Sequence, residues 1–189
     1  MARPFSEEET EESTALRCQY EQHGVENYYA QFGVEYRNPH EPIIAEVLRE
    51  AVSRWSPDIS SVLDLACGSG EISLALRELG AEHIDGIDPF TGEAYLARTG
   101  KHAEAFRFED VAAGALSERR YSLVACSFAM HLLEESWLPS LLFQLGEISD
   151  SLLILTPHKR PELKAEWGWI LQDEFMIERV RARLYRLKK

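Results

Sequence analysis

The sequence lacks long apolar runs, has few cysteines and carries fewer basic than acidic residues. No hydrophobic stretch approaches the ~18–20 residues needed to cross a bilayer, so we predict no membrane span. The three cysteines have neither paired nor metal-type spacing, and residues 1–5 lack the apolar core of a secretory signal. We therefore expect reduced thiols and a cytoplasmic location. The net charge of −12, from 20 basic and 32 acidic residues, argues against general affinity for nucleic-acid backbones.

An aromatic segment precedes the first strong helix signal. Residues 27–40 hold four aromatic side chains, one arginine and one histidine, which is unusual for a plain connector. The tyrosines and phenylalanine of this segment could form a lid over a ligand or pack an N-terminal helix on the domain. Prolines 39 and 42 then favour a helix start. The following apolar residues recur at helical spacing, so this helix should bury one face: Ile44, Val47, Leu48, Ala51 and Trp55.

Strand and helix patterns alternate through the rest of the chain. Short apolar runs predict strands at residues 61–66, 83–88, 105–108, 121–127, 152–156 and 175–185. Helical spacing falls between them, at residues 71–79, 93–98, 111–116 and 136–148. This alternation predicts an α/β fold with a doubly wound, mainly parallel sheet and helices on both faces. A seventh strand is either missing or formed by the terminal residues.

The stretch at residues 61–70 organises this pattern. It reads as a buried strand ending in an acid, followed by a glycine turn and the start of a helix, which is the first half of a nucleotide-binding unit. Gly68 and Gly70 allow close approach of the backbone to a ligand. A dinucleotide fingerprint would have glycine where Ser73 stands, so the turn favours a nucleoside without a pyrophosphate. An acid at residue 64 could then receive an ammonium group directly or through water.

The stretch from Asp64 to Gly70, Asp-Leu-Ala-Cys-Gly-Ser-Gly, resembles motif I of the class I S-adenosylmethionine-dependent methyltransferases. Ala66 stands where that family usually has glycine. Acids at the ends of the next two predicted strands also match positions of that family: Asp88 after the second strand, and Phe108-Glu109-Asp110 after the third. Ser127 begins the segment that corresponds to the family's fourth motif. The resemblance covers roughly residues 60–157. It implies a Rossmann-like S-adenosylmethionine-binding domain at residues 57–189, with residues 1–56 as a helical and aromatic cover of the same domain.

The resemblance also implies a cofactor, S-adenosyl-L-methionine, and the residues that hold it. In that family the acid at the position of Asp88 binds the ribose hydroxyls. The acid at the position of Asp110 receives the adenine amino group. Asp88 has another reading as a turn residue before Pro89, and Asp110 another as the cap of a helix that starts at Val111. The expected cofactor-binding set is Asp64, Ala66, Gly68, Gly70, Asp88, Pro89, Asp110, Val111 and Ser127.

The acceptor side should form at the carboxyl ends of the strands, where such sheets bind ligands. His131 follows the fourth predicted strand and His158 the fifth, so these two and Tyr29 are the candidate catalytic residues. Each has a structural alternative. His131 could cap the next helix or pack as an aromatic ring, His158 could hydrogen-bond a backbone carbonyl, and Tyr29 could pack the N-terminal helix on the sheet. No close ligand spacing supports a metal site. The candidate substrate-binding residues combine an aromatic ring with positive charge suited to an anionic group: Tyr36, Arg37, His40, Lys159 and Arg160.

The sequence therefore predicts an S-adenosylmethionine-dependent methyltransferase. Small size and net acidity slightly favour a small-molecule acceptor, which could be anionic. One alternative is a methyltransferase acting on an RNA or nucleotide end, because residues 29–38 loosely resemble the N-terminal signature of RNA 5′-phosphate methyltransferases. Another is a non-catalytic partner subunit with this fold. Neither the acceptor atom nor the oligomeric state follows from the sequence.

Overall fold

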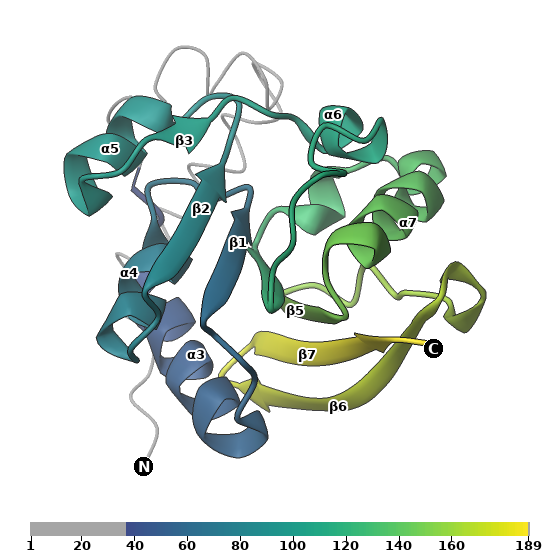
Figure 1. Ribbon diagram of the computed structural model, residues 1–189. Coiled ribbons are helices and arrows are strands. Elements are labelled where there is room, and N and C mark those ends of the chain that lie inside the picture. Colours follow the sequence, from purple (N-terminus) through teal and green to yellow (C-terminus); the bar gives the residue numbers. More distant parts are fainter. Residues whose placement is uncertain (1–36, 189) are drawn as a thin grey trace, which may run out of the picture.

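Seven strands of the described chain form one sheet. The computed structural model describes residues 37–188, shown in Figure 1. The strand order is β3-β2-β1-β4-β5-β7-β6. Strands β1 to β5 pair in parallel, whereas β7 pairs antiparallel with both β5 and β6. The predicted doubly wound, mainly parallel sheet is confirmed.

The elements follow one another in the expected alternation. The strands are β1 (Ser61–Leu65), β2 (His83–Ile87), β3 (Ala103–Glu104), β4 (Leu123–Ser127), β5 (Ser151–Thr156), β6 (Trp169–Ile177) and β7 (Val180–Leu187). The α-helices are α3 (Glu41–Trp55), α4 (Glu71–Glu78), α5 (Gly92–Thr99), α6 (Phe108–Ala112) and α7 (Leu138–Ile148). Three short 3-10 turns connect them: η2 (Met130–Leu132), η3 (Glu135–Trp137) and η4 (Ala165–Trp167).

Helices cover both faces of the sheet because side chains alternate along its strands. In β1, Val62 packs in the cluster with α3 and α4, whereas Leu63 and Leu65 pack in the cluster with α6 and α7. Figure 1 shows these two helix pairs on opposite sides of the strands. All the strand residues that form these contacts are nearly inaccessible to solvent. The alternation also directs Asp64, between Leu63 and Leu65, toward α4.

Helix α3 is the described part of the N-terminal cover, and it packs directly on the domain. Proline occupies its first turn. Its buried residues are Ile43, Ile44, Val47, Leu48 and Ala51, so the predicted face is confirmed except for Trp55, which is only partly buried. They join residues of α4 and of β7 in one apolar cluster. Burial of a Leu, Ile or Val side chain stabilises a fold by roughly 1.5–3 kcal/mol. The apolar face of α3 therefore anchors its amino end near the carboxyl ends of the strands.

Two predicted strands are wrong. The third strand lies at residues 103–104 rather than 105–108, because Phe106 and Phe108 turn into a cavity and residue 108 already begins α6. The single last strand at 175–185 is a hairpin of two strands, β6 and β7, which reverse direction at Glu178, where φ is +54°. The terminal residues thus supply the seventh strand.

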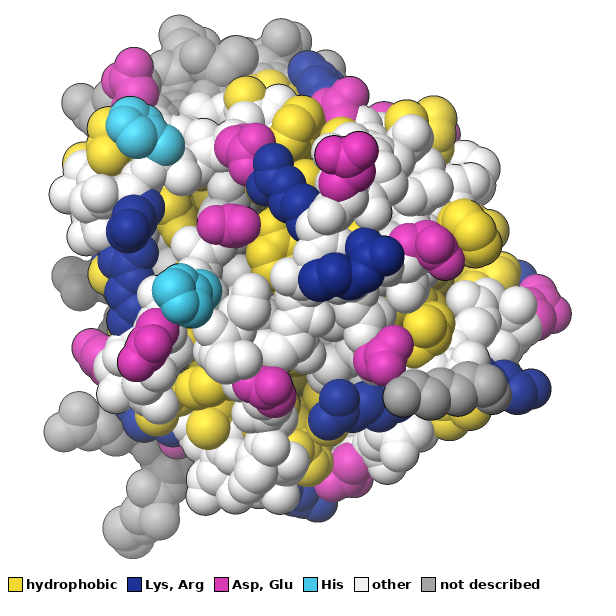
Figure 2. All heavy atoms as spheres, viewed as in Figure 1, with side chains coloured by type: hydrophobic (Ala, Val, Ile, Leu, Met, Phe, Trp, Pro, Cys, Tyr) yellow, Lys and Arg dark blue, Asp and Glu magenta, His cyan; other side chains and the backbone are white. Residues whose placement is uncertain are grey.

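Basic residues near the C-terminus are paired with acids on β6. Glu174 accepts hydrogen bonds from Arg181 Nη1 at 2.7 Å and Arg183 Nε at 3.2 Å. Asp173 similarly binds Arg54 of α3 at 3.0 Å. Figure 2 shows acidic and basic side chains interspersed on the face it views. The basic tail of the sequence is therefore neutralised in part by the neighbouring strand.

Two further features bear on the chemical class of the protein. Cys67 and Cys126 are free and buried, and burial raises the pKa of both thiols, that of Cys126 to about 12. They are poor nucleophiles as a result. Among residues 37–188, no helix has both the length and the apolar character to cross a membrane.

Candidate functional site

The glycine turn after β1 is closed by backbone hydrogen bonds. Cys67 N–H donates to the carbonyl of Ile87 at 3.0 Å, and Gly70 N–H donates to the carbonyl of Cys67 at 2.8 Å. The turn needs positive φ at three residues: Ala66 (+58°), Gly68 (+55°) and Gly70 (+95°). Glycine adopts these angles without the steric penalty that a Cβ imposes. Ala66 accepts that penalty at the position where glycine is usual in the family it resembles.

Tyr95 of α5 lies beneath this turn. A Cβ at Gly70 would come within 2.5 Å of Thr99 Cγ2, and one at Gly86 would come within 2.6 Å of the Tyr95 ring. The Tyr95 hydroxyl is 2.8 Å from Ser73 Oγ. Gly86 in β2 therefore makes room for the Tyr95 ring, whereas Gly70 in the turn makes room chiefly for Thr99 and lies next to the same ring.

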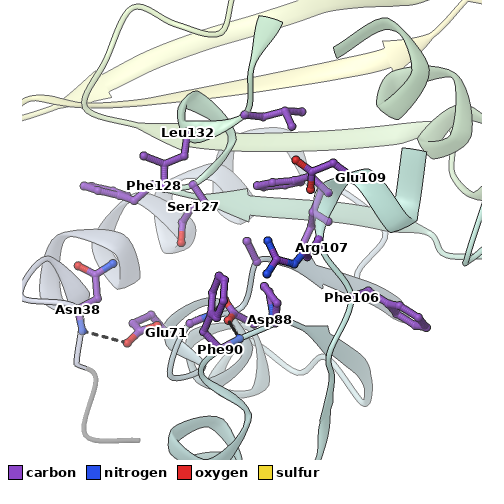
Figure 3. Close-up of a pocket in the computed structure, with 17 residues that line it drawn as sticks. Asn38, Glu71, Asp88, Phe90, Phe106, Arg107, Glu109, Ser127, Phe128 and Leu132 are labelled. Atoms are coloured by element: carbon purple, nitrogen blue, oxygen red, sulfur yellow. Dashed lines mark hydrogen bonds between the residues drawn. The ribbon is translucent and has the colours of Figure 1, made fainter. Parts of the chain in front are cut away.

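A cavity of about 220 Å³ opens in front of the turn, at the carboxyl ends of β1, β2 and β4. Figure 3 shows Asn38 and Glu71 at one end, Phe106, Arg107 and Glu109 at the other, and Asp88 and Phe90 between them. Its lining is Asn38, Leu65, Ala66, Gly68, Glu71, Asp88, Pro89, Phe90, Phe106, Arg107, Phe108, Glu109, Ser127, Phe128, Ala129, Leu132 and Leu133. Apolar surface predominates, and a few polar groups converge on it.

Asp88 is fixed at the centre of this cavity by its own loop. Its Oδ1 accepts the backbone N–H groups of Phe90 at 2.9 Å and Thr91 at 3.0 Å, and its Oδ2 accepts that of Gly68 at 3.3 Å. A carboxylate offers about four acceptor positions, so at least one stays available for a ligand. Asp88 can therefore stabilise its turn and also accept a hydrogen bond from a ligand.

The cavity end near α6 is aromatic. The Arg107 guanidinium lies 5.2 Å from the centroid of the Phe90 ring. Asp110 does not line the cavity: its carboxylate accepts the Arg107 backbone N–H at 2.8 Å and caps α6, and Val111 after it is buried in the core. Glu109 lines the cavity in its place. The capping alternative for Asp110 is confirmed in part: Asp110 caps its helix, but from within α6, which begins at residue 108 rather than at Val111. The acid that faces the cavity is its neighbour Glu109.

Asp64 also points away from the cavity. It is 1% exposed, and its Oδ2 accepts Ser73 N–H at 3.1 Å and Ser73 O–H at 2.6 Å. Burial, reinforced by the charges of Glu71 and Asp88, raises the pKa of Asp64 to about 8. The predicted cofactor-binding residue Asp64 therefore does not line the cavity, and its carboxyl group supports the first turn of α4 from inside the core.

The acceptor-side residues lie along the loops after β4 and β5. Ser127 and Phe128 line the cavity, and the His40 ring stacks on Phe128 with centroids 5.1 Å apart. His131 and His158 contact each other, with centroids 4.3 Å apart, next to the lining residue Leu132 but outside the lining itself. The structure therefore brings together the two predicted histidines beside the cavity.

The predicted basic mouth is not part of the cavity. Arg37, Lys159 and Arg160 are exposed and do not line it. The loop that carries the last two is fixed by buried Arg183, whose Nη1 donates to the carbonyls of Lys159 at 3.0 Å and Pro161 at 2.8 Å. The predicted site residues Tyr29 and Tyr36, the rest of residues 1–36 and Cys18 lie outside the described residues.

Comparisons with known proteins agree with this geometry. Residues 62–148 match the model of a methyltransferase domain family. The chain is 34% identical, over 227 aligned positions, to an uncharacterised protein of Schizosaccharomyces pombe, covering 91% of this chain and 92% of that one. The chain belongs to the class I S-adenosylmethionine-dependent methyltransferases.

Solved structures of this methyltransferase family share the fold at low identity. One is the magnesium protoporphyrin IX methyltransferase of Synechocystis with bound S-adenosylmethionine, at a TM-score of 0.58, 14% identity and full coverage of both chains. Another is the ribosomal protein L11 methylase of Lactobacillus delbrueckii, at a TM-score of 0.56 and 17% identity, covering 82% of this chain and 81% of that chain. These likenesses show the fold alone.

The cavity of this methyltransferase suits S-adenosylmethionine in its donor set. Aromatic rings at one end can hold a purine, a central carboxylate can accept a ribose hydroxyl, and acids suit a cofactor that carries positive charge. The predicted lining residues Ala66, Gly68, Asp88, Pro89 and Ser127 are in place. The predicted residue Gly70 belongs to the turn but does not line the cavity.

Several lining residues were missed. Glu71, Glu109 and Phe128 each stand next to a predicted site residue, so the motifs located the right segments. In one of them the lining acid is Glu109 rather than the predicted Asp110. Asn38 gave no signal, because only packing of α3 brings it to the cavity.

Proposed function

We propose that this chain binds S-adenosyl-L-methionine in the cavity and transfers its methyl group to a small-molecule acceptor. The observation that carries the proposal is the position of Asp88, whose carboxylate is held by three backbone N–H groups between the glycine turn and an aromatic end of the cavity. When bound, the cofactor supplies an electrophilic methyl group on a positively charged sulfur.

Each part of the cavity has a separate role in this proposal. Asp88 accepts a ribose hydroxyl, and Phe106, Phe108 and Phe90 enclose the base. Phe128, Leu132 and Leu133 exclude water from the reacting end, which matters because methyl transfer depends on alignment and dryness. These residues provide binding and orientation rather than a strong proton acceptor.

The histidines beside the cavity favour an acceptor that is already anionic at neutral pH and needs no base. Burial, together with the charge of His158, lowers the pKa of His131 to about 4, so this imidazole is a weak base. A carboxylate or phosphate acceptor needs no base, whereas a hydroxyl does. The net charge of −12 and the paired basic residues of β7 are also less suited to RNA than to a small molecule.

Calorimetry with Asp88→Asn tests cofactor binding. The wild-type chain should bind S-adenosylmethionine and S-adenosylhomocysteine, and Asp88→Asn should weaken both by about tenfold or more, because an amide cannot accept hydrogen bonds at both terminal atoms. Asp85→Asn, on the strand β2 that precedes Asp88, is the matched control, since an amide there still accepts the Tyr121 hydroxyl hydrogen, 2.8 Å in wild type. Absence of binding by the wild-type chain would overturn the proposal.

The acceptor class is tested with methyl-labelled S-adenosylmethionine. The chain is incubated separately with a deproteinised small-molecule fraction, an RNA fraction and a protein fraction, and the transferred label is measured in each. Transfer to the small-molecule fraction is expected. Label confined to RNA or to protein would contradict the small-molecule acceptor while leaving methyltransferase activity established.

A further inference from the structure

Glu71 occupies the cavity end where the cofactor's amino-acid portion would lie. It is the first residue of α4, directly after the glycine turn, and only 4% of it is exposed. Figure 3 places it beside Asn38, at the end of the cavity opposite Phe106, Arg107 and Glu109. If the aromatic end holds the base, the opposite end holds the amino acid, and Glu71 is the carboxylate there.

The hydrogen bonds of Glu71 leave one of its oxygens for a ligand. Its Oε1 accepts the Asn38 backbone N–H at 3.3 Å, Arg98 Nη1 at 3.2 Å and the Ser69 hydroxyl hydrogen. Among residues 37–188, these donors all reach Oε1, and the structure shows none on Oε2. The side chain is therefore fixed in place without being saturated.

Charge around Glu71 is also incompletely balanced. Arg98 is shared between Glu71 and Glu41, so the three side chains carry a net charge of −1, and Asp88 lies on the same cavity. Glu41 is 37% exposed and is compensated in part by water, whereas Glu71 is not. A buried carboxylate with surplus negative charge favours a cationic partner.

We propose that Glu71, and not Asp64, receives the ammonium group of the cofactor's amino-acid portion. This inference rests on the proposed function. Asp64 cannot serve directly, because it does not line the cavity: it is buried behind the turn, where it accepts hydrogen bonds from Ser73 of α4. Arg98 is a positioning residue, which holds Glu71 and connects it to α3 through Glu41.

Two ligands that differ only in the amino-acid portion separate this role from a structural one. S-adenosylhomocysteine has the ammonium group, and 5′-methylthioadenosine has the same nucleoside and sulfur without it. Glu71→Gln keeps an acceptor at Oε1 for Asn38 and Ser69 and removes the charge. We expect it to weaken S-adenosylhomocysteine by about tenfold or more in calorimetry and to leave 5′-methylthioadenosine unchanged.

Two further variants complete the experiment. Glu78→Gln, at the exposed end of the same helix, should leave both affinities at wild-type values. Arg98→Met breaks the same ion pair but increases the negative charge at Glu71, so S-adenosylhomocysteine should not weaken relative to 5′-methylthioadenosine. A structural role would instead make Glu71→Gln and Arg98→Met change the affinity ratio alike.

The outcomes separate failure of this inference from failure of the proposed function. Equal weakening of both ligands by Glu71→Gln, or no weakening of either, would overturn the role of Glu71 while the wild-type affinities still supported a cofactor site. Wild-type protein that bound neither ligand would overturn the proposed function itself. Binding of 5′-methylthioadenosine by Glu71→Gln reports that the variant is folded.

Discussion

The imidazole rings of His131 and His158 lie 4.3 Å apart, centroid to centroid, at an angle of 47°. One follows β4 and the other follows β5, and these adjacent parallel strands place their carboxyl ends side by side. Within the described structure, the buried Nδ1 of His131 has no hydrogen-bond partner. Burial and the neighbouring His158 together disfavour a proton on His131, whose pKa falls to about 4.

Replacing His131 should remove part of the acid sensitivity of the fold. Because the folded-state pKa is lowered from 6.5 to about 4, the unfolded chain binds more protons than the folded chain between these values. The wild-type free energy of unfolding should therefore fall as the pH drops from 6.5 to 4, and it should not change above 6.5 on account of this group. His131→Phe should show a smaller fall, measured as urea midpoints at pH 7 and pH 5.

Exposed His102 provides the matched control for this prediction. His102→Phe should keep the wild-type difference between the two pH values. If His131→Phe and wild type lost equal stability on acidification, the lowered pKa of His131 would be wrong.

Asp64→Asn should have the opposite pH dependence. Burial raises the folded-state pKa of Asp64 from 3.8 to about 8, so between these values the folded chain retains a proton that the unfolded chain has lost. The wild-type contribution from this group is present at low pH and is lost as the pH rises toward 8. Asparagine resembles the neutral acid and does not titrate. The variant should therefore gain stability relative to wild type from pH 5 to pH 8, measured by urea unfolding.

A constant difference between Asp64→Asn and wild type over this range would show that Asp64 is ionised in the folded protein. That result would also reopen a direct role for Asp64 toward a cationic ligand. The test is independent of the affinity measurements on Glu71.

Sequence periodicity was sufficient for most of the fold. The apolar residues of β1, β4 and β5 face two helix layers, so they appear as nearly continuous runs. Helices α3 and α7 each bury one apolar stripe, which has a recognisable spacing. The hairpin of β6 and β7 was missed because β6 is only partly buried and includes the charged residues Asp173 and Glu174, which mask its strand character.

The candidate site was predictable in its segments and not in its side chains. Strand ends with acids located the cavity, because parallel strands end at one edge of the sheet. Whether Asp64 faces the ligand or the core depends on its neighbour Ser73 and on alternation along β1, which the motif does not specify. The ion pair of Arg98 with Glu41 joins residues far apart in sequence, so only the packing of α3 reveals it.

Gly86→Ala should destabilise the fold through Tyr95. A Cβ at residue 86 would lie 2.6 Å from the Tyr95 ring, which is fully buried and cannot retreat. Overpacking of this kind costs about 1–3 kcal/mol. Urea unfolding should show a loss in that range, and a much smaller one when the same change is made in a Tyr95→Leu background.

Gly92→Ala serves as the control for the same substitution. Its Cβ would meet only a backbone oxygen, at the ordinary distance of 3.9 Å. The stability should stay close to the wild-type value. Equal effects of the two substitutions would mean that lost chain flexibility, rather than contact with Tyr95, governs the response.

Ala66→Gly should be tolerated and should slightly stabilise the glycine turn. The φ of +58° at Ala66 imposes a penalty of roughly 1–2 kcal/mol on a residue with a Cβ, whereas the greater freedom of glycine in the unfolded chain offsets about 0.4–1 kcal/mol of the gain. The net change in the free energy of unfolding should thus be positive and about 1 kcal/mol. Ala97→Gly, at an exposed position within α5, should instead lower stability by about 1 kcal/mol. Urea unfolding of the two variants therefore gives shifts of opposite sign, and a loss at residue 66 comparable to that at residue 97 would show that Ala66 is not held in a left-handed conformation.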